Sequence, residues 1–334
     1  MERSSNIIQL AWATRQVWPP CIWFPVPGAK HYKNSYYSNL SYSFVNLSIT
    51  GEACTCCCAH CNAKLLQTMV PTTTPEKMCR LVDRLLEKGC QGILVSGGAN
   101  SNGEVPLLPF QGAIKYAKQQ GLRVLVHGGL IRSGTAASLK EAGVDQVLLD
   151  VIGHERTIRE VYHLDRKPED YFKSMIACRE LGLEIVPHVV IGLHFGHILG
   201  EIRALQMIGD MSPQTLVLVI LSPLIGTEMA FLEPPPVKEV ALVIAKARVW
   251  NPFTPLALGC ARPPGQYKRQ IERIALDCGV NAIAYPDKST VAYAQTRGLK
   301  TQFSERCCSL IGENLTYKIE ALNEIGTEQA TERR

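Results

Sequence analysis

The chain has 334 residues, of which 46% are apolar and 19% are charged, and its formal net charge is +5. This is the composition of an ordinary globular protein with enough length for a large core. The Lys and Arg residues are dispersed, which gives no case for nucleic-acid binding. No apolar run reaches the ~18 residues that a membrane helix needs, so we expect no membrane association.

The chain contains 13 cysteines, and its first residues, Met1–Ser5, lack the basic-then-apolar order of an export signal. Many cysteines without an export signal indicate a reducing compartment. There they serve metal binding more often than disulfide formation. We therefore expect a cytoplasmic protein whose cysteines bind metal.

Residues 1–42 are expected to form an irregular N-terminal arm. The proline-containing stretches Val17–Cys21 and Phe24–Gly28 break any regular element. Several tyrosines follow, which argues for an ordered arm and against a disordered tail. Cys21 in this arm is either a buried small hydrophobe or a ligand of a metal cluster.

Residues 43–300 alternate short β-branched runs with longer amphipathic ones. This alternation predicts an α/β fold with a parallel sheet covered by helices, and eight repeats predict a closed, eight-stranded TIM-type (β/α) barrel. Residues 301–334 are expected to be a C-terminal tail. The predicted strands are residues 43–49, 92–96, 123–127, 146–150, 184–191, 215–221, 256–258 and 281–284. The predicted helices are residues 74–88, 110–120, 135–142, 169–181, 197–208, 237–250, 267–278 and 290–297.

The stretch Cys54–Cys61 follows the first predicted strand and holds five cysteines. Within it, Cys54, Cys58 and Cys61 stand at C-x3-C-x2-C spacing. Three thiolates so close together suit a [4Fe–4S] cluster that leaves one iron open for a ligand. A zinc site would want a fourth ligand, and a group of unpaired thiols is the other alternative. Cys56 and Cys57 are surplus to this spacing.

Polar and glycine residues stand at the carboxyl ends of the predicted strands, where (β/α) barrels carry their chemistry. Two adjacent glycines let a ligand approach the backbone. Asp150 could accept hydrogen bonds from a ligand or cap the next helix, and His188 is either a core histidine or a ligand contact. The candidate residues at these ends are Ser96, Gly97, Gly98, Asp150, His188, Gly192, His194 and Ser222.

A second group of cysteines lies late in the chain. Cys260 and Arg262 follow the seventh predicted strand, and Cys307 and Cys308 lie near the C-terminus. If the tail folds back over the barrel, these thiolates meet and bind a second iron–sulfur cluster. The alternative is that they are separate buried thiols. The remaining cysteines, predicted to be core residues, are Cys79, Cys90, Cys178 and Cys278.

The cysteine spacing resembles the signature of radical S-adenosylmethionine (SAM) enzymes. The resemblance implies that the open iron binds SAM and that the reduced cluster releases a 5′-deoxyadenosyl radical from it. His60 stands where the superfamily usually has an aromatic ring. The resemblance also implies that Ser96, Gly97 and Gly98 hold the amino group of SAM. It implies that the segment around Gly192 packs on the adenosine. Asp150, if it does not cap the next helix, could accept hydrogen bonds from the ribose, and backbone groups around Ser222 could hold the adenine edge.

Several stretches also resemble the two-component lipoyl synthases, a pair of related radical SAM proteins. They include Ser96–Gly103, Pro187–His194, Leu258–Pro263 and the final Cys307 and Cys308. This resemblance implies a biotin synthase-like fold, and insertion of sulfur at C6 or C8 of an octanoyl chain linked to a lysine of a carrier protein. The second cluster would donate the sulfur.

The implied partners are a paralogous radical SAM subunit, an octanoylated lipoyl domain or H protein, and a one-electron donor such as ferredoxin. Three alternatives stay open. They are a biotin-synthase-like thiolase, a radical SAM mutase without a second cluster, and a non-catalytic partner subunit.

Overall fold

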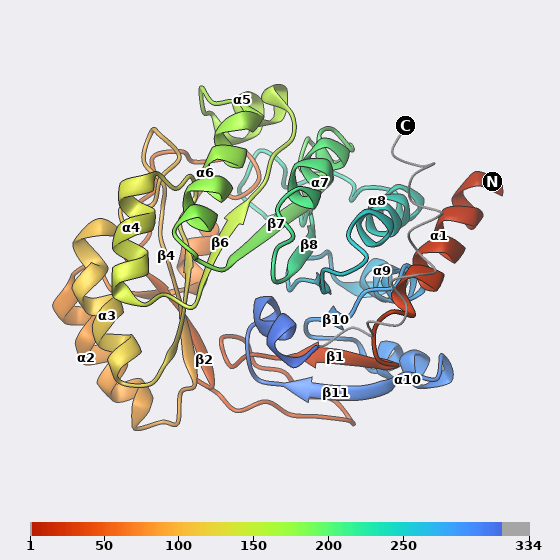
Figure 1. Cartoon of the computed structure of the whole chain (residues 1–334), viewed down its shortest axis with the longest axis horizontal. Coiled ribbons are helices and arrows are strands. Elements are labelled where there is room, and N and C mark those ends of the chain that lie inside the picture. Colours follow the sequence, from red (N-terminus) through yellow and green to blue (C-terminus); the bar gives the residue numbers. More distant parts are fainter. Residues whose placement is uncertain (1, 316–334) are drawn as a thin grey trace.

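The computed structural model describes residues 2–315, and its strands form one curled parallel sheet with helices along its outer side (Figure 1). The strands lie in the order β11, β1, β10, β9, β8, β7, β6, β5, β4, β2, β3. Their bounds are β1 Cys21–Pro25, β2 Phe44–Ser48, β3 Val70–Pro71, β4 Gly92–Ser96, β5 Arg123–His127, β6 Gln146–Asp150, β7 Ile185–Ile191, β8 Leu216–Ile220, β9 Leu256–Leu258, β10 Ala282–Ile283 and β11 Lys300–Ser304.

All eight helices that the sequence predicts are present, within a few residues at each end. Their bounds are α1 Glu2–Arg15, α2 Pro75–Leu86, α3 Gln111–Gln119, α4 Ser133–Ala142, α5 Glu155–Tyr162, α6 Pro168–Glu180, α7 Glu201–Gly209, α8 Val237–Trp250, α9 Gly265–Asp277 and α10 Lys288–Thr296. Short 3-10 helices are η1 Lys64–Thr68, η2 Leu108–Phe110 and η3 Cys308–Asn314. The sequence analysis missed α1 and α5.

All eight predicted strands are present, and they pair in parallel in chain order from β2 to β10. The predicted TIM-type α/β class is confirmed, but the predicted closure into an eight-stranded barrel is wrong, because the described residues form an 11-stranded sheet. In the described residues β10 pairs with β1 instead of β2, and β1 then pairs with β11. The sheet therefore stays open, because a strand from the N-terminal stretch occupies the place beside β10 that closure requires.

The stretch 1–42, predicted as irregular, thus supplies α1 and the paired strand β1. Figure 1 shows β1 beside β11, although the two come from opposite ends of the chain. Val17–Cys21 does end a helix, as proline-rich segments do. Phe24 and Pro25, however, lie within the strand.

Small inward-facing residues on β9 and β10 make room for the C-terminal segment η3. Leu310 and Ile311 of η3 pack in one cluster with Ala257 of β9 and Ala282 of β10. The same cluster includes residues at inward-facing positions of β5 to β8, among them Leu125, Leu148, Val186 and Val217. The end of the described chain therefore fills the interior of the curled sheet.

Arg248 of α8 is fully buried and pairs with no carboxylate in the described chain. Its guanidinium donates to carbonyl oxygens that follow the carboxyl ends of α8 and α9, where the helix dipoles are negative. The accepting atoms, 2.5–3.1 Å away, are the carbonyl oxygens of Asn251, Pro252, Thr254 and Gly279 and Oδ1 of Asn281. Burial places the pKa of Arg248 well below its ordinary value, and these acceptors compensate for the cost.

Arg248→Met should lower the free energy of unfolding by about 3 kcal/mol or more, because several buried carbonyl groups would lose their donor. Thermal unfolding followed by circular dichroism measures the change. Lys238→Met, at an exposed position of the same helix, is the control and should be near neutral. Equal stability of the two variants would contradict a structural role for Arg248.

Candidate active site

The cysteine loop follows β2 at the carboxyl edge of the sheet. The thiols at C-x3-C-x2-C spacing, none of them exposed, are those of Cys54, Cys58 and Cys61. The surplus thiols are directed at backbone carbonyls. Cys56 Sγ donates to Asn100 O at 3.2 Å, and Cys57 Sγ donates to Cys54 O at 3.1 Å. Cys54 Sγ is likewise directed at Ala99 O at 3.8 Å, and Cys56 lines the same hollow as the predicted ligands. Only Cys57, which is exposed, is set apart from them.

Two neighbouring elements hold this loop in place. The Thr55 N–H donates to the carbonyl oxygen of Ala99, just after β4, at 2.9 Å. The Ala59 N–H donates to the carbonyl oxygen of Val161 in α5 at 2.8 Å. The cysteines are thus positioned by the segments that follow β4 and β6.

Gly98 lies directly against the cysteine loop. A Cβ on Gly98 would lie 2.0 Å from Ala53 O and 2.5 Å from Cys54 Cα. Its N–H donates to Thr50 Oγ1 at 2.7 Å. The Gly97–Gly98 pair, predicted to admit a ligand, is therefore also required for the loop to reach its position.

The ligand atoms of Cys58, His60 and Cys61 lie within 4.8 Å of one another, the one such group in residues 2–315. A hydrogen bond from the Cys58 thiol lowers the pKa of Cys61 to about 4 despite burial, and His60 adds to this effect. His60 Nδ1 is buried and has no hydrogen-bond partner among the described residues. Closely spaced thiols beside an imidazole with a free nitrogen are metal-ligand groups, so Cys58, His60 and Cys61 fit a metal centre. Cys54, the third predicted ligand, lies outside this close group.

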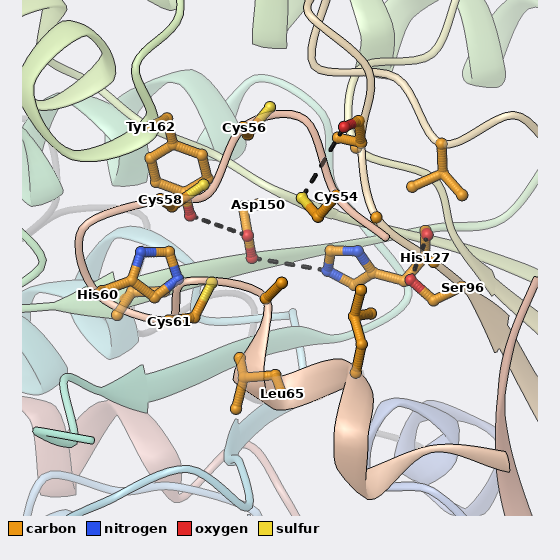
Figure 2. A pocket seen from close by; sticks show the side chains of 18 of the residues that line it. Cys54, Cys56, Cys58, His60, Cys61, Leu65, Ser96, His127, Asp150 and Tyr162 are labelled. Atoms are coloured by element: carbon orange, nitrogen blue, oxygen red, sulfur yellow. Dashed lines mark hydrogen bonds and ion pairs between the residues drawn. The ribbon is translucent and has the colours of Figure 1, made fainter. Parts of the chain in front are cut away.

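A hollow of about 430 Å³ extends from the cysteine loop into the curl of the sheet. Figure 2 shows how Cys54, Cys58, His60, Cys61, Ser96, His127, Asp150 and Tyr162 surround it. Most of its remaining lining is apolar, including Leu65, Leu94, Val105, Leu130, Val219 and Leu224. Such a hollow suits a ligand with a long apolar part and few polar groups.

Asp150 is the centre of a polar group in this hollow. Its Oδ1 lies 3.6 Å from His127 Nε2, and its Oδ2 accepts a hydrogen bond from Tyr162 at 3.1 Å. Burial opposes ionisation of Asp150, but His127 lowers its pKa below the ordinary range. His188 lies 5.7 Å from the His127 ring, and burial, with the charge of His127, lowers its pKa to about 4.

The helix-capping alternative for Asp150 is wrong. The N-cap of α5 is His154, whose side chain accepts from the Arg156 N–H. Asp150 instead faces the hollow, so its carboxylate is available to a ligand hydroxyl on that side.

The other candidates at strand ends divide into two groups. Ser96 and Ser222 line the hollow, and each donates to a nearby backbone carbonyl. His194 is buried beside Glu160, with 3.8 Å between Nε2 and Oε2, and does not line the described hollow. Gly192 does not line it either. Its N–H donates to the buried Glu201 Oε1 at 2.8 Å, which fixes the turn after β7.

The late cysteines Cys260, Cys307 and Cys308 lie in one region. Cys260 is accessible to solvent, yet protein surrounds it so closely that burial raises the pKa of its thiol. Cys307, Cys308 and Tyr285 belong to one packed cluster, and after burial the charges of the three thiols raise the pKa of Tyr285. A hydrogen bond from the Cys308 thiol lowers the pKa of Cys307 to about 6.

Arg262 stabilises the loop that carries Cys260. It is buried, and its guanidinium donates to Glu272 Oε1 at 2.5 and 3.0 Å and to Gly259 O at 2.5 Å. It also donates to the carbonyls of Ala284 and Tyr285. With its donors occupied in this way, Arg262 fixes the loop that carries Cys260 and is not free to contact a cluster.

Cys21 lies at the amino end of β1, opposite Lys300 at the amino end of β11. Cys307 follows the carboxyl end of β11. Because the two strands are parallel, the cysteines lie toward opposite ends of the sheet. The alternative of Cys21 as a cluster ligand is therefore wrong.

Two residues of the hollow, His127 and Tyr162, were missing from the predicted site. His127 is the last residue of its strand, as Asp150 is, so the same signal could have identified it. Tyr162 lies in the unpredicted helix α5, and no local pattern links it to Asp150.

The radical SAM superfamily model matches residues 48–204. That segment holds the cysteine loop, the glycine pair and Asp150. Residues 48–204 are a radical SAM domain.

The radical SAM domain has curated relatives named biotin synthase. The chain is 25% identical over 224 residues to one from Alkalilimnicola ehrlichii, which covers 64% of each protein. It is 22% identical over 248 residues to one from Acidithiobacillus ferrooxidans, covering 72% of this chain and 77% of that protein. The chain thus spans less than two thirds of the first of these relatives.

Solved structures show the same fold. Methylornithine synthase (PylB) superposes with a TM-score of 0.60 at 14% identity, covering 90% of this chain and 89% of that one. The FeFe-hydrogenase maturase HydG from Carboxydothermus hydrogenoformans gives 0.61 at 15% identity, covering 92% and 74%. A radical SAM domain implies a [4Fe–4S] cluster and SAM, and the cysteine loop holds the candidate ligands. None of the helices in the described part of the chain has the length and apolar character to span a membrane.

Gly98→Ala should destabilise the protein by about 1–3 kcal/mol, because the added methyl group overlaps the cysteine-loop backbone. It should also reduce the iron retained after anaerobic reconstitution. Gly112→Ala is the control, since a Cβ there meets nothing within 4 Å. Iron assay and thermal unfolding of both variants test the contact. Full iron content in Gly98→Ala would contradict it.

Proposed function

We propose that this chain inserts sulfur into an unactivated C–H bond of an octanoyl chain carried on a lysine, as one component of a two-protein lipoyl synthase. One observation carries the proposal. A mainly apolar hollow begins at the cysteine loop and reaches Ala261, next to Cys260 of the second thiol group. A substrate in this hollow would lie between a radical source and a sulfur source.

The shape and polarity of the hollow support a linear acyl substrate. About 430 Å³ of mainly apolar space can take a long hydrocarbon chain, and each buried methylene contributes ~0.8 kcal/mol to its binding. The mouth is apolar as well, since Leu65 is half-exposed and Ile225, next to Leu224 of the lining, is largely exposed. An acyl chain could enter there while its carrier stays outside.

The chemistry divides between cofactors and protein. When bound, a reduced [4Fe–4S] cluster with SAM would supply a radical able to remove hydrogen from a methylene group, and a second iron–sulfur cluster would supply sulfur. Cys54, Cys58 and Cys61 would hold the first cluster. The apolar walls would orient the chain and exclude water from the radical.

The partners of this proposal follow from the substrate. An octanoylated lipoyl domain or H protein would present the acyl chain. A paralogous radical SAM subunit would act at the other carbon, and a donor such as ferredoxin would supply electrons.

A second candidate function is a biotin-synthase-like thiolation, which the curated relatives favour. It would use the same sulfur source and a different substrate. Sulfur insertion into an octanoyl-lysine peptide or into the small-molecule precursor of biotin therefore distinguishes the two functions.

A radical SAM mutase would need one cluster only. About eight iron atoms per chain indicate two cubane clusters, and about four indicate one.

Cys58→Ala should abolish formation of 5′-deoxyadenosine, because the first cluster would lose a ligand. Anaerobically reconstituted protein, SAM and a reductant are incubated, and the product is measured by mass spectrometry. Cys57→Ala, which removes an exposed surplus thiol, is the matched control and should keep activity. SAM cleavage by the Cys58 variant would refute the ligand assignment.

Cys260→Ala, and the double variant Cys307→Ala/Cys308→Ala, should still cleave SAM but add no sulfur to an octanoyl-lysine peptide. The physical reason is that these thiols would hold the sulfur source and not the radical source. Mass spectrometry of the peptide, with a candidate partner subunit present, reports sulfur gain. The control is Cys278→Ala, which removes a buried thiol that donates to Ala241 O and belongs to neither group. Sulfur insertion by the first two variants would reject the proposal.

A further inference from the structure

A tight turn after Cys58 brings three possible metal ligands together. The carbonyl oxygen of Cys58 accepts hydrogen bonds from the N–H groups of Cys61 at 3.0 Å and Asn62 at 2.8 Å. This closed turn explains why the ligand atoms of Cys58, His60 and Cys61 lie within 4.8 Å of one another. Figure 2 shows His60 beside the two thiols. The backbone of the turn therefore positions all three ligands.

The close spacing of these ligand atoms matches the ligands of a single metal ion. Zinc binds sulfur at about 2.3 Å and nitrogen at about 2.0–2.1 Å, so two ligand atoms of one tetrahedral ion lie about 3.5–4 Å apart. The cysteines of an iron–sulfur cluster instead bind different iron atoms, which spreads their sulfurs over a larger unit. Small side-chain adjustments are therefore enough for this group to take one ion.

His60 has the surroundings of a metal ligand. Its Nδ1 is buried and has no hydrogen-bond partner among the residues that the structure describes, which is costly unless something binds there. The ring packs against Tyr162, with 5.3 Å between the ring centroids, and Tyr162 is fixed by its hydrogen bond to Asp150. The imidazole is thus held in place with a free nitrogen, the group that most often binds metals in proteins.

The other cysteines of the loop are directed at backbone carbonyls. The sulfur–oxygen distances are 3.8, 3.2 and 3.1 Å for Cys54, Cys56 and Cys57, respectively. Cys54, which the C-x3-C-x2-C spacing assigns to the cluster, is therefore outside the close group. A single-ion site and the cluster would share Cys58 and Cys61 and differ in their third residue.

We propose that, when the chain holds no iron–sulfur cluster, Cys58, His60 and Cys61 bind a single divalent ion of the zinc type. Two thiolates and a neutral imidazole balance the charge of such an ion, as a mainly apolar hollow requires. Zinc sites with three protein ligands keep a fourth position open, and here that position borders the hollow that all three residues line. Zinc(II) binds such ligands more tightly than iron(II) does.

The single ion and the cluster exclude each other, because both need the sulfurs of Cys58 and Cys61. Bound zinc would therefore block cluster assembly until it is removed. This inference needs neither the second group of thiols nor an acyl substrate. It goes beyond the proposed function, and its failure would leave that proposal unchanged.

The test uses the full chain, purified anaerobically with reduced thiols and without iron. The protein is titrated with Co²⁺ alone, because cobalt takes the tetrahedral sites of zinc and its thiolate complexes absorb visible light. We expect one Co²⁺ per chain, displaced by one equivalent of Zn²⁺. X-ray absorption of the zinc form should show two sulfur ligands at about 2.3 Å and one imidazole nitrogen at about 2.0–2.1 Å.

Two variants separate the single-ion site from the cluster. His60→Phe should weaken Co²⁺ binding by ~10-fold or more, since even an outer-shell partner of a metal is worth about 10–100-fold. It should still take up the cluster on reconstitution with iron and sulfide. Cys54→Ala should do the reverse, binding Co²⁺ as the parent does and losing the cluster.

A matched control and a competition complete the experiment. His31→Asn removes an exposed histidine and should change neither Co²⁺ binding nor cluster uptake. One equivalent of Zn²⁺ added before reconstitution should lower the iron taken up by the parent several-fold and have little effect on His60→Phe. Circular dichroism checks that each variant is folded.

Three results would overturn the inference, each in a different way. Co²⁺ bound without thiolate absorption would place the ion outside the cysteine loop. Equal affinity of His60→Phe and the parent would exclude His60 as a ligand. Loss of Co²⁺ binding in Cys54→Ala would assign the third position to Cys54.

Discussion

The close contact between Gly98 and the backbone of Ala53 and Cys54 is the constraint on which the site depends. With a carbonyl 2.0 Å from where a Cβ would be, only glycine allows the cysteine loop to lie over the end of β4. Hydrogen bonds from Thr55 and Ala59 then connect the loop to the segment after β4 and to α5. Loops far apart in the sequence thus become one rigid support for three thiols, as preorganised sites require.

A second constraint acts at the opposite side of the sheet, where the inward-facing residues of β9 and β10 are alanines. They leave the space that η3 fills, and η3 brings Cys307 and Cys308 into the interior. Arg262 holds the loop of Cys260 against the end of β10 through buried bonds to Glu272 and nearby carbonyls. The position of the second group of thiols is therefore determined by residues outside that group, namely the alanines of β9 and β10 and the buried Arg262.

The sequence predicted those features that depend on local pattern. Eight apolar runs predicted the eight strands, and the cysteine spacing predicted the candidate ligand loop. Both patterns are contained in short stretches of the sequence. Closure of the sheet was not predictable in this way. It depends on whether β1 or β2 pairs with β10, a contact between distant segments. The role of Arg262 was missed for a similar reason, since a buried partner such as Glu272 cannot be distinguished from a surface glutamate by composition.

Asp150 connects the two ends of the hollow. A buried carboxylate is costly unless it is paired and hydrogen-bonded, and its partners, Tyr162 and His127, come from α5 and β5. Helix α5 holds the cysteine loop through Val161, whereas β5 faces the second group of thiols. The single carboxylate therefore joins the helix that supports the cysteine loop to the strand that carries His127. Loss of its charge would remove the partner that Tyr162 and His127 share.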